Sequence, residues 1–157
     1  MSVMSDQQAF AKLKGFFENR RACVVAAEPL KAKVEIGIVI NKNLPCAFFK
    51  QKDGKPKFEQ REAVKPDVVF FLKPEGVDAL LDDDTDDVAE LGARLVKLYL
   101  GGMMDIKVPG SMFNLLTNGY LGIYRAGGLP FAKFIGAHGL SSLGKIKEFV
   151  QKLRQKS

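Results

Sequence analysis

Residues 66–81 read PDVVFFLKPEGVDALL and place a strand directly before a helix. The apolar run 68–72 lies between two prolines, which is typical of a strand buried on both faces of a sheet. Pro74 suits the first position of a helix, because a proline there lacks only an N–H that would have no partner inside the helix. The stretch therefore predicts a strand over 68–72 and a short helix that ends near Leu81.

Alternating apolar residues elsewhere predict the rest of a sheet. Residues 34–40 alternate with the two-residue period of a half-buried strand. Asp53-Gly54 lies between two further strand-like runs, 46–51 and 57–62. An Asp-Gly pair is a good hairpin signal, because glycine tolerates the positive φ of a tight turn. Residues 104–108 alternate again and predict a last strand.

Helical periodicity accounts for most of the remaining chain. Ser5 and Gln8 form a capping box that opens a helix. Its apolar stripe comprises Ala9, Phe10, Leu13, Phe16 and Phe17. The acidic run 82–87 provides a cap and favourable charge for a helix that ends at Gly101-Gly102. Further helices are predicted over 111–118 and 143–153, so the order of elements indicates an α+β sandwich of sheet and helices.

The composition is that of one globular domain. The chain has 157 residues, of which 46% are hydrophobic and 27% charged. Cys23 and Cys46 are too few for a disulfide scaffold and fit a reducing compartment, so we expect a cytoplasmic location. The polar N-terminus and the lack of a run of roughly 18 apolar residues lead us to expect neither a secreted nor a transmembrane protein.

The net charge of +6 is unevenly distributed. Residues 75–90 hold eight acidic residues and no basic one, and residues 125–157 hold seven basic residues against Glu148. Such a basic region suits transient contact with an anionic membrane surface, and the simpler alternative is a set of solvated helix faces. No nucleic-acid-binding signature accompanies the scattered basic residues, so we expect no nucleic-acid partner.

Residues able to carry chemistry are few. His138 is the only histidine, so no histidine cluster exists to hold a metal. Cys23 and Cys46 have apolar neighbours and are interpreted as core residues, although a small enzyme using Cys46 or His138 stays an alternative. The segment 139–145 has the glycine and lysine spacing of a phosphate loop, but Ile146 occupies the position of its Ser or Thr. We expect no catalytic residue, no metal and no cofactor.

Apolar residues exceed what a sheet core obviously needs. Phe48-Phe49 and Phe70-Phe71 are adjacent pairs within strands, so each pair points to both faces of the sheet. Met103, Met104 and Met112 add flexible side chains that adapt to irregular contents. An apolar cavity between sheet and helices would use this surplus, and the alternative is that these side chains simply pack against one another.

Residues 66–81 resemble the sterol carrier protein (SCP-like) domain family, which has an Ala/Pro-Asp, a strand, Ser/Pro-Glu-Asp and a short helix ending in Ala-Leu-Leu. Ile106-Lys107-Val108-Pro109-Gly110-Ser111-Met112 looks like its late strand-to-helix signature. The resemblance covers roughly residues 5–122. We therefore interpret 1–157 as a single domain, with a sterol-carrier-like core over 5–122 and a basic apolar tail with a C-terminal helix over 123–157.

The resemblance implies a five-stranded, mostly antiparallel sheet covered by helices. It also implies non-catalytic binding of a fatty acid, fatty acyl chain or sterol in a hydrophobic tunnel. Candidate lining residues are Phe70, Leu95, Tyr99, Met104, Met112, Leu115 and Leu116. Candidate lid residues in the tail are Leu121, Gly122, Ile123, Tyr124, Arg125, Phe131, Lys133, Phe134 and Ile135. The alternative is an interaction module that docks an acidic partner through its basic C-terminal helix, and the oligomeric state stays open.

Overall fold

The computed structural model of the chain describes residues 4–82, 86–120, 122–123, 125 and 143–156. The helices are α1 (Asp6–Asn19), α2 (Arg21–Ala27), α3 (Pro74–Leu81), α4 (Val88–Leu100), α5 (Met112–Thr117) and α7 (Leu143–Lys156). The strands are β1 (Glu35–Ile40), β2 (Leu44–Lys50), β3 (Pro56–Glu59), β4 (Val69–Leu72) and β5 (Met104–Lys107).

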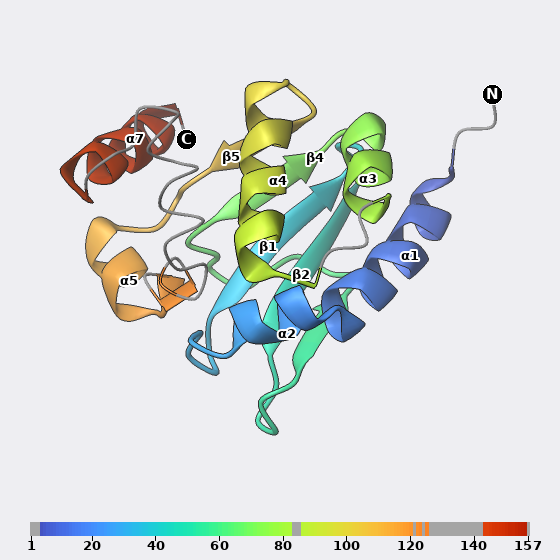
Figure 1. The fold of residues 1–157 in the computed structure, drawn as a ribbon, viewed down its shortest axis with the longest axis horizontal. Helices are drawn as coiled ribbons and strands as arrows, with labels where there is room; N and C mark the ends of the chain where they lie inside the picture. Colours follow the sequence, from blue (N-terminus) through green and yellow to red (C-terminus); the bar gives the residue numbers. More distant parts are fainter. Residues whose placement is uncertain (1–3, 83–85, 121, 124, 126–142, 157) are drawn as a thin grey trace.

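The five strands form one sheet in the order β3-β2-β1-β4-β5. The β1–β4 pair is parallel and the other three pairs are antiparallel. Helices α1 to α4 lie on one face of this sheet (Figure 1). The prediction of an α+β fold with a five-stranded, mostly antiparallel sheet covered by helices is therefore confirmed.

The hairpin between β2 and β3 forms where Asp53-Gly54 predicts it. Gly54 has a φ of 87°, and the Asp53 carboxylate accepts a 2.9 Å hydrogen bond from the Lys55 backbone N–H. Strand β3 ends at Glu59 and not at residue 62 as the pattern predicts. Just after this strand end, Arg61 donates to Glu59 at 3.0 Å and to Glu35 of β1 at 2.7 Å.

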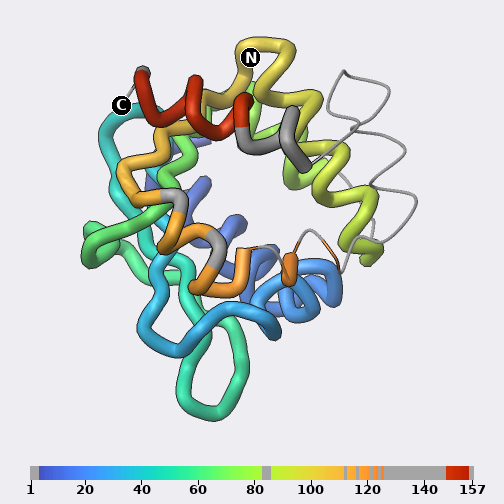
Figure 2. The backbone as a smooth tube through the Cα atoms, turned by 90° about the vertical axis from the view of Figure 1, so that its left-hand side faces the viewer, coloured from blue at the N-terminus to red at the C-terminus, as the bar shows by residue number. Residues whose placement is uncertain are grey.

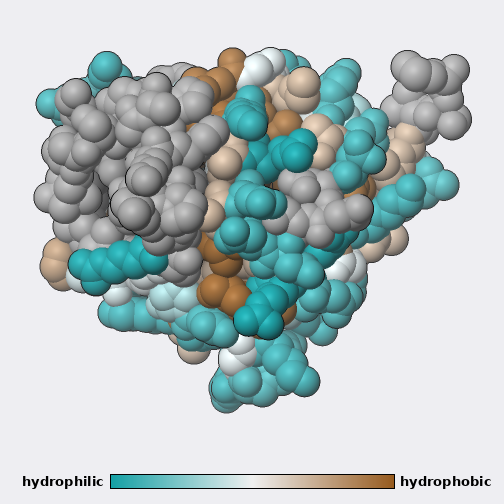
Figure 3. Space-filling view, in the orientation of Figure 1, coloured by the Kyte–Doolittle hydropathy of each residue, from teal (hydrophilic) through white to brown (hydrophobic). Residues whose placement is uncertain are grey.

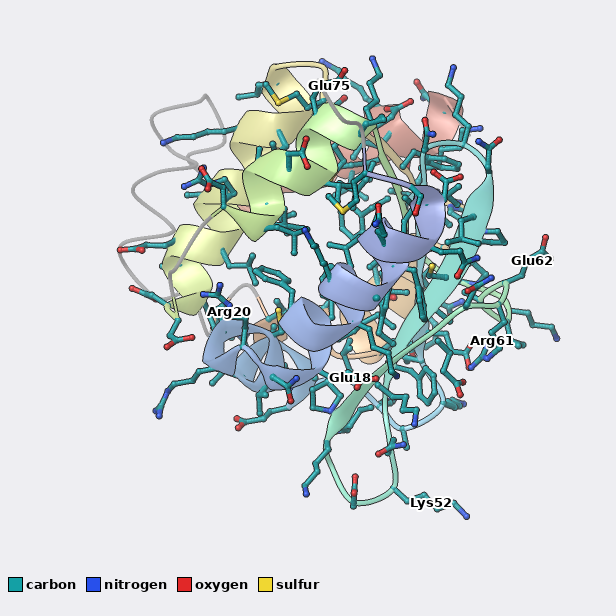
Figure 4. The ribbon with its side chains drawn as sticks, turned by 90° about the vertical axis from the view of Figure 1, so that its right-hand side faces the viewer. Glu18, Arg20, Lys52, Arg61, Glu62 and Glu75 are labelled. Atoms are coloured by element: carbon teal, nitrogen blue, oxygen red, sulfur yellow. The ribbon has the colours of Figure 1, made fainter. Side chains whose placement is uncertain are left out.

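Helix α1 begins with the expected capping box. The Gln8 backbone N–H donates to the Ser5 hydroxyl at 3.1 Å, and the Ser5 N–H donates to the Gln8 side chain at 3.0 Å. Near the other end of α1, Glu18 accepts a 2.9 Å hydrogen bond from the Phe58 N–H of β3. Figure 4 shows Glu18 next to the β2–β3 hairpin, whose Lys52 points away from the body of the protein. The bond between Glu18 and Phe58 joins α1 to the β3 edge of the sheet.

The prediction that β4 is buried on both faces is wrong, since only Leu72 of this strand is fully buried. Phe71 lies on the face opposite the helices, and the Lys107 ammonium lies 5.2 Å from the centre of its ring. Phe49 of β2 is covered in the same way by Arg61, at 5.1 Å. Long basic side chains with apolar stems thus shield the outer phenylalanines without a second layer of helices.

Helix α2 does not follow from the sequence patterns above. Its N-cap residue, Arg20, makes no side-chain capping bond, and the helix has only seven residues. Burial of Ala22, Cys23 and Ala27 holds it against the core. A short helix without a cap is stabilised mainly by tertiary packing, which a local sequence pattern does not reveal.

Helix α7 lies beside β5 and above α5 on one side of the molecule (Figure 2). The Phe149 ring contacts the Tyr99 ring of α4 edge to face, with centroids 5.8 Å apart. Arg154 donates to the backbone carbonyl of Gly110 at 2.6 Å, and Leu153 is buried. The apolar side of this helix therefore packs within the chain. Among the described helices, none combines the length and apolar character needed to cross a bilayer.

Candidate functional site

An apolar cavity of about 240 Å³ lies between the sheet and the helices that cover it. The sheet contributes Ile36, Ile38, Phe48, Phe70, Leu72 and Met104 to its described lining. The helices contribute Phe17, Cys23, Ala26, Leu80, Leu91 and Leu95. Val68, Tyr120 and Ile123 complete the described part of the wall.

Strand register explains why these sheet residues share one wall. Ile38 of β1 pairs directly with Phe70 of β4, so both side chains point to the helical face. Phe70 lies in the sheet and Leu95 in the helical layer opposite it. Both side chains are only partly buried, since part of each surface lines the cavity. Protein interiors rarely leave voids larger than a water molecule, so a space of this volume is a structural feature of the fold.

The structure separates the seven candidate lining residues into three groups. Phe70, Leu95 and Met104 line the cavity. Tyr99 and the half-buried Leu115 are outside its described lining, and Tyr99 contacts Phe149 instead. The side chains of Met112 and Leu116 are not among those that the structure describes.

Twelve of the fifteen described lining residues were not among the sequence-based candidates for the lining. Cys23 and Ala26 of α2 were missed, although their three-residue spacing is the signal that puts two side chains on one helix face. Tyr120 was also missed as a wall residue. Ile123 was assigned to a lid, and it lies in the described wall. The other lid candidates, apart from Gly122 and Arg125, fall outside the described residues.

Neither cysteine is suited to nucleophilic chemistry. Burial raises the pKa of the Cys23 thiol to about 12, and burial raises the pKa of Cys46 to about 12 as well. A thiol with such a pKa holds almost no thiolate at neutral pH. His138 and the first part of the phosphate-loop-like segment 139–145 fall outside the described residues. Within the part of the chain that the structure describes, no three His, Cys, Asp or Glu side chains are grouped to hold a metal.

Tyr120 brings a hydroxyl group to the described lining of the cavity, and Asp67 acts on this residue electrostatically. The Tyr120 hydroxyl oxygen is buried, and among the described residues it has no hydrogen-bond partner. Burial raises the pKa of this hydroxyl, and the negative charge of Asp67 raises it further. Asp67 is the one buried charged residue in the described core, and its carboxylate accepts hydrogen bonds from Asn118 at 2.8 Å and Asn114 at 3.4 Å.

Comparisons with known proteins find similarity only among solved structures. No protein-family model matches the chain, and no curated protein matches it. A structure named UbiJ-SCP2 ubiquinone synthesis protein is 11% identical, with a TM-score of 0.46, over 76% of this chain and 96% of that one.

Two sterol carrier structures match as well. Sterol carrier protein domain 2 of Helicoverpa armigera is 20% identical over 82% of this chain and 96% of that one, with a TM-score of 0.42. Sterol carrier protein 2 from Yarrowia lipolytica, in its apo form, is 12% identical over 81% of this chain and 98% of that one, with a TM-score of 0.37. The names of all three structures refer to SCP2 or to a sterol carrier protein, the family that residues 66–81 resemble. TM-scores below 0.5 add no weight to a functional assignment, which therefore rests on the cavity.

Proposed function

We propose that this chain binds a lipid, such as a fatty acid, a fatty acyl chain or a sterol, in the cavity between sheet and helices, without catalysing a reaction. The supporting observation is a cavity of about 240 Å³ with an almost wholly apolar described wall. Apolar cavities of roughly 150 Å³ stay dry and accept benzene. Each CH₂ group that leaves water for such a site contributes about 0.8 kcal/mol.

Phe70, Leu95 and Met104 are the residues that we propose contact the ligand. Phe70 and Met104 come from neighbouring strands, and Leu95 comes from the helix above them. The cavity is slightly smaller than the roughly 300 Å³ at which common ligand sites begin, so a long chain requires side chains to move. Met104 suits this role, because an unbranched thioether changes conformation easily.

Packing of α7 weighs against a module that docks an acidic partner through this helix. Leu153 is 4% exposed, and Phe149 contacts Tyr99. Arg154 is occupied by its hydrogen bond to the Gly110 carbonyl. The apolar side of the helix and one of its basic groups therefore have partners inside the chain.

We also propose that loading and release occur during transient contact with an anionic membrane. The net charge of +6 and the exposed apolar side chains of Leu100 and Phe113 support this proposal. Figure 3 shows hydrophobic side chains reaching the surface on the α4 side of the molecule. We expect a fluorescent lipid to transfer faster to vesicles containing phosphatidylglycerol than to pure phosphatidylcholine. Equal rates at low salt would contradict the contact.

Organic extraction of the purified protein, followed by mass spectrometry, tests the binding function. We expect a lipid in the extract at a substantial fraction of one molecule per chain. A protein of similar size purified in the same way controls for carried-over membrane. An extract without lipid, together with no displacement of a fluorescent fatty acid, would favour the interaction module.

A further inference from the structure

Among the described residues, the Tyr120 hydroxyl has no hydrogen-bond partner, and it belongs to an apolar wall. Tyr120 lines the cavity, and its hydroxyl oxygen is buried. No described residue accepts from it or donates to it. Burying a hydroxyl without a hydrogen bond is unfavourable, and native proteins rarely leave such groups unpaired. A polar group of a ligand bound in the cavity would satisfy this hydroxyl.

We propose that the Tyr120 hydroxyl selects the ligand by donating a hydrogen bond to one uncharged oxygen at the polar end of an otherwise apolar molecule. An alcohol, ketone or ester oxygen has the required chemistry. This inference rests on the proposed lipid-binding function and narrows its ligand class. It places the polar end of the ligand beside Tyr120 and the hydrocarbon part against the remaining wall.

Charge around the hydroxyl favours a neutral ligand over a carboxylate. The described lining contains no lysine, arginine or histidine that would compensate a buried negative charge. Asp67 acts on Tyr120 electrostatically, and together with burial it raises the pKa of the phenol. The phenol therefore stays protonated and able to donate at neutral pH. The same Asp67 charge repels an anionic headgroup.

Local backbone geometry holds Tyr120 in place. Gly119 precedes it with a φ of 102°, in the left-handed region that favours glycine. A Cβ atom at Gly119 would overlap the carbonyl of Pro29, so the turn lies directly against the chain that follows α2. The Asn118 carbonyl accepts a hydrogen bond from the Lys31 N–H at 3.3 Å. The tyrosine thus follows a turn fastened to the rest of the fold, which suits a fixed donor.

The test compares decane, 1-decanol and decanoate as competitors of the uncharged dye Nile red, at pH 8, on the full chain. We expect Tyr120→Phe to weaken 1-decanol binding about fivefold, the loss typical of one hydrogen bond, and to leave decane binding unchanged. Tyr99→Phe removes a phenol hydroxyl outside the described wall and should leave the affinities for both 1-decanol and decane unchanged. Decanoate should bind the wild type more weakly than 1-decanol.

Two results would overturn the selection by Tyr120. One is equal 1-decanol affinity in Tyr120→Phe and the wild type while decane still binds both. The other is tighter binding of decanoate than of 1-decanol. Either result leaves the proposed lipid binding intact, whereas a wild type that binds neither the dye nor decane would contradict both. Thermal unfolding of each variant confirms that the substitutions leave the fold intact.

Discussion

The side-chain amide of Asn118 donates a 2.8 Å hydrogen bond to the carboxylate of Asp67. Asp67 is 7% exposed and directly precedes the β4 region, whereas Asn118 is the C-cap of α5. A buried carboxylate needs donors to replace lost water, and Asn114 provides a second one at 3.4 Å. This contact joins the start of residues 66–81 to the turn that carries Tyr120.

We expect Asn118→Ala to lower the free energy of unfolding by about 1–3 kcal/mol, because it leaves a buried carboxylate oxygen without its shortest hydrogen bond. Urea denaturation measures the change. Asn43→Ala, at an exposed position, is the matched control and should have little effect. An Asn118→Ala variant as stable as the control would show that this bond contributes nothing to folding.

Gly110 packs so closely against Asp67 that a side chain does not fit. A Cβ atom there would overlap the Asp67 carboxylate, and the Gly110 N–H donates to the Asp67 carbonyl at 3.2 Å. We expect Gly110→Ala to destabilise the fold by about 1–3 kcal/mol, as overpacking usually does. Gly15→Ala has open space around it in α1 and should stabilise by about 0.5–1 kcal/mol. Similar melting temperatures for the two variants would contradict the claim that Gly110 has no room for a side chain.

Stability at acid pH should depend on Glu35. Arg61 donates to both Glu35 carboxylate oxygens, at 2.7 and 2.8 Å, and these bonds lower the pKa of Glu35 from its ordinary value of 4.5 although burial opposes them. A group with a lowered pKa in the folded state stabilises the protein fully above its unfolded pKa. That contribution is lost as the pH falls through the folded pKa.

Urea unfolding of the wild type and Glu35→Gln at several pH values tests this dependence. The stability gap between them should be widest above pH 4.5 and should shrink as the pH falls below it. A gap that stays constant from pH 7 to pH 3 would mean that the Arg61 pair contributes no pH-dependent stability.

The two cysteines should be unreactive in the folded protein. Burial raises the pKa of Cys23 and of Cys46 to about 12, so a disulfide reagent at pH 8 meets almost no thiolate. We expect Ellman's reagent to detect no thiol in the native protein within minutes and both thiols in urea. Rapid reaction of Cys46 in the native state would revive the alternative of a cysteine enzyme.

Most elements could be predicted from sequence because their signals are local. The capping box at Ser5, the hairpin turn at Asp53-Gly54 and the helix start at Pro74 each act within a few residues. Helix α2 lacks such a signal, since its seven residues have no capping side chain. Outward-facing Phe71 misled the prediction for β4, because its cover is Lys107, a residue distant in sequence.

The residues that line the cavity were harder to predict, because the position of an empty space depends on how distant segments pack together. Phe70, Leu95 and Met104 were lining candidates under the sterol-carrier resemblance, and they do line the cavity. Cys23 looks like any buried core residue in sequence, and only the fold shows that it borders the hollow. Tyr120 depends on the turn at Gly119 packing against Pro29, a contact between distant segments.

Filling the cavity is the most direct test of lipid binding inside the fold. Ala26 lines the cavity from α2, so Ala26→Phe should place an aromatic ring in the space for the ligand. Ala11→Phe adds the same ring to the exposed side of α1. Titration with Nile red should give one site per chain in the wild type and Ala11→Phe, and binding at least tenfold weaker in folded Ala26→Phe. Equal binding by all three proteins would contradict an internal lipid site.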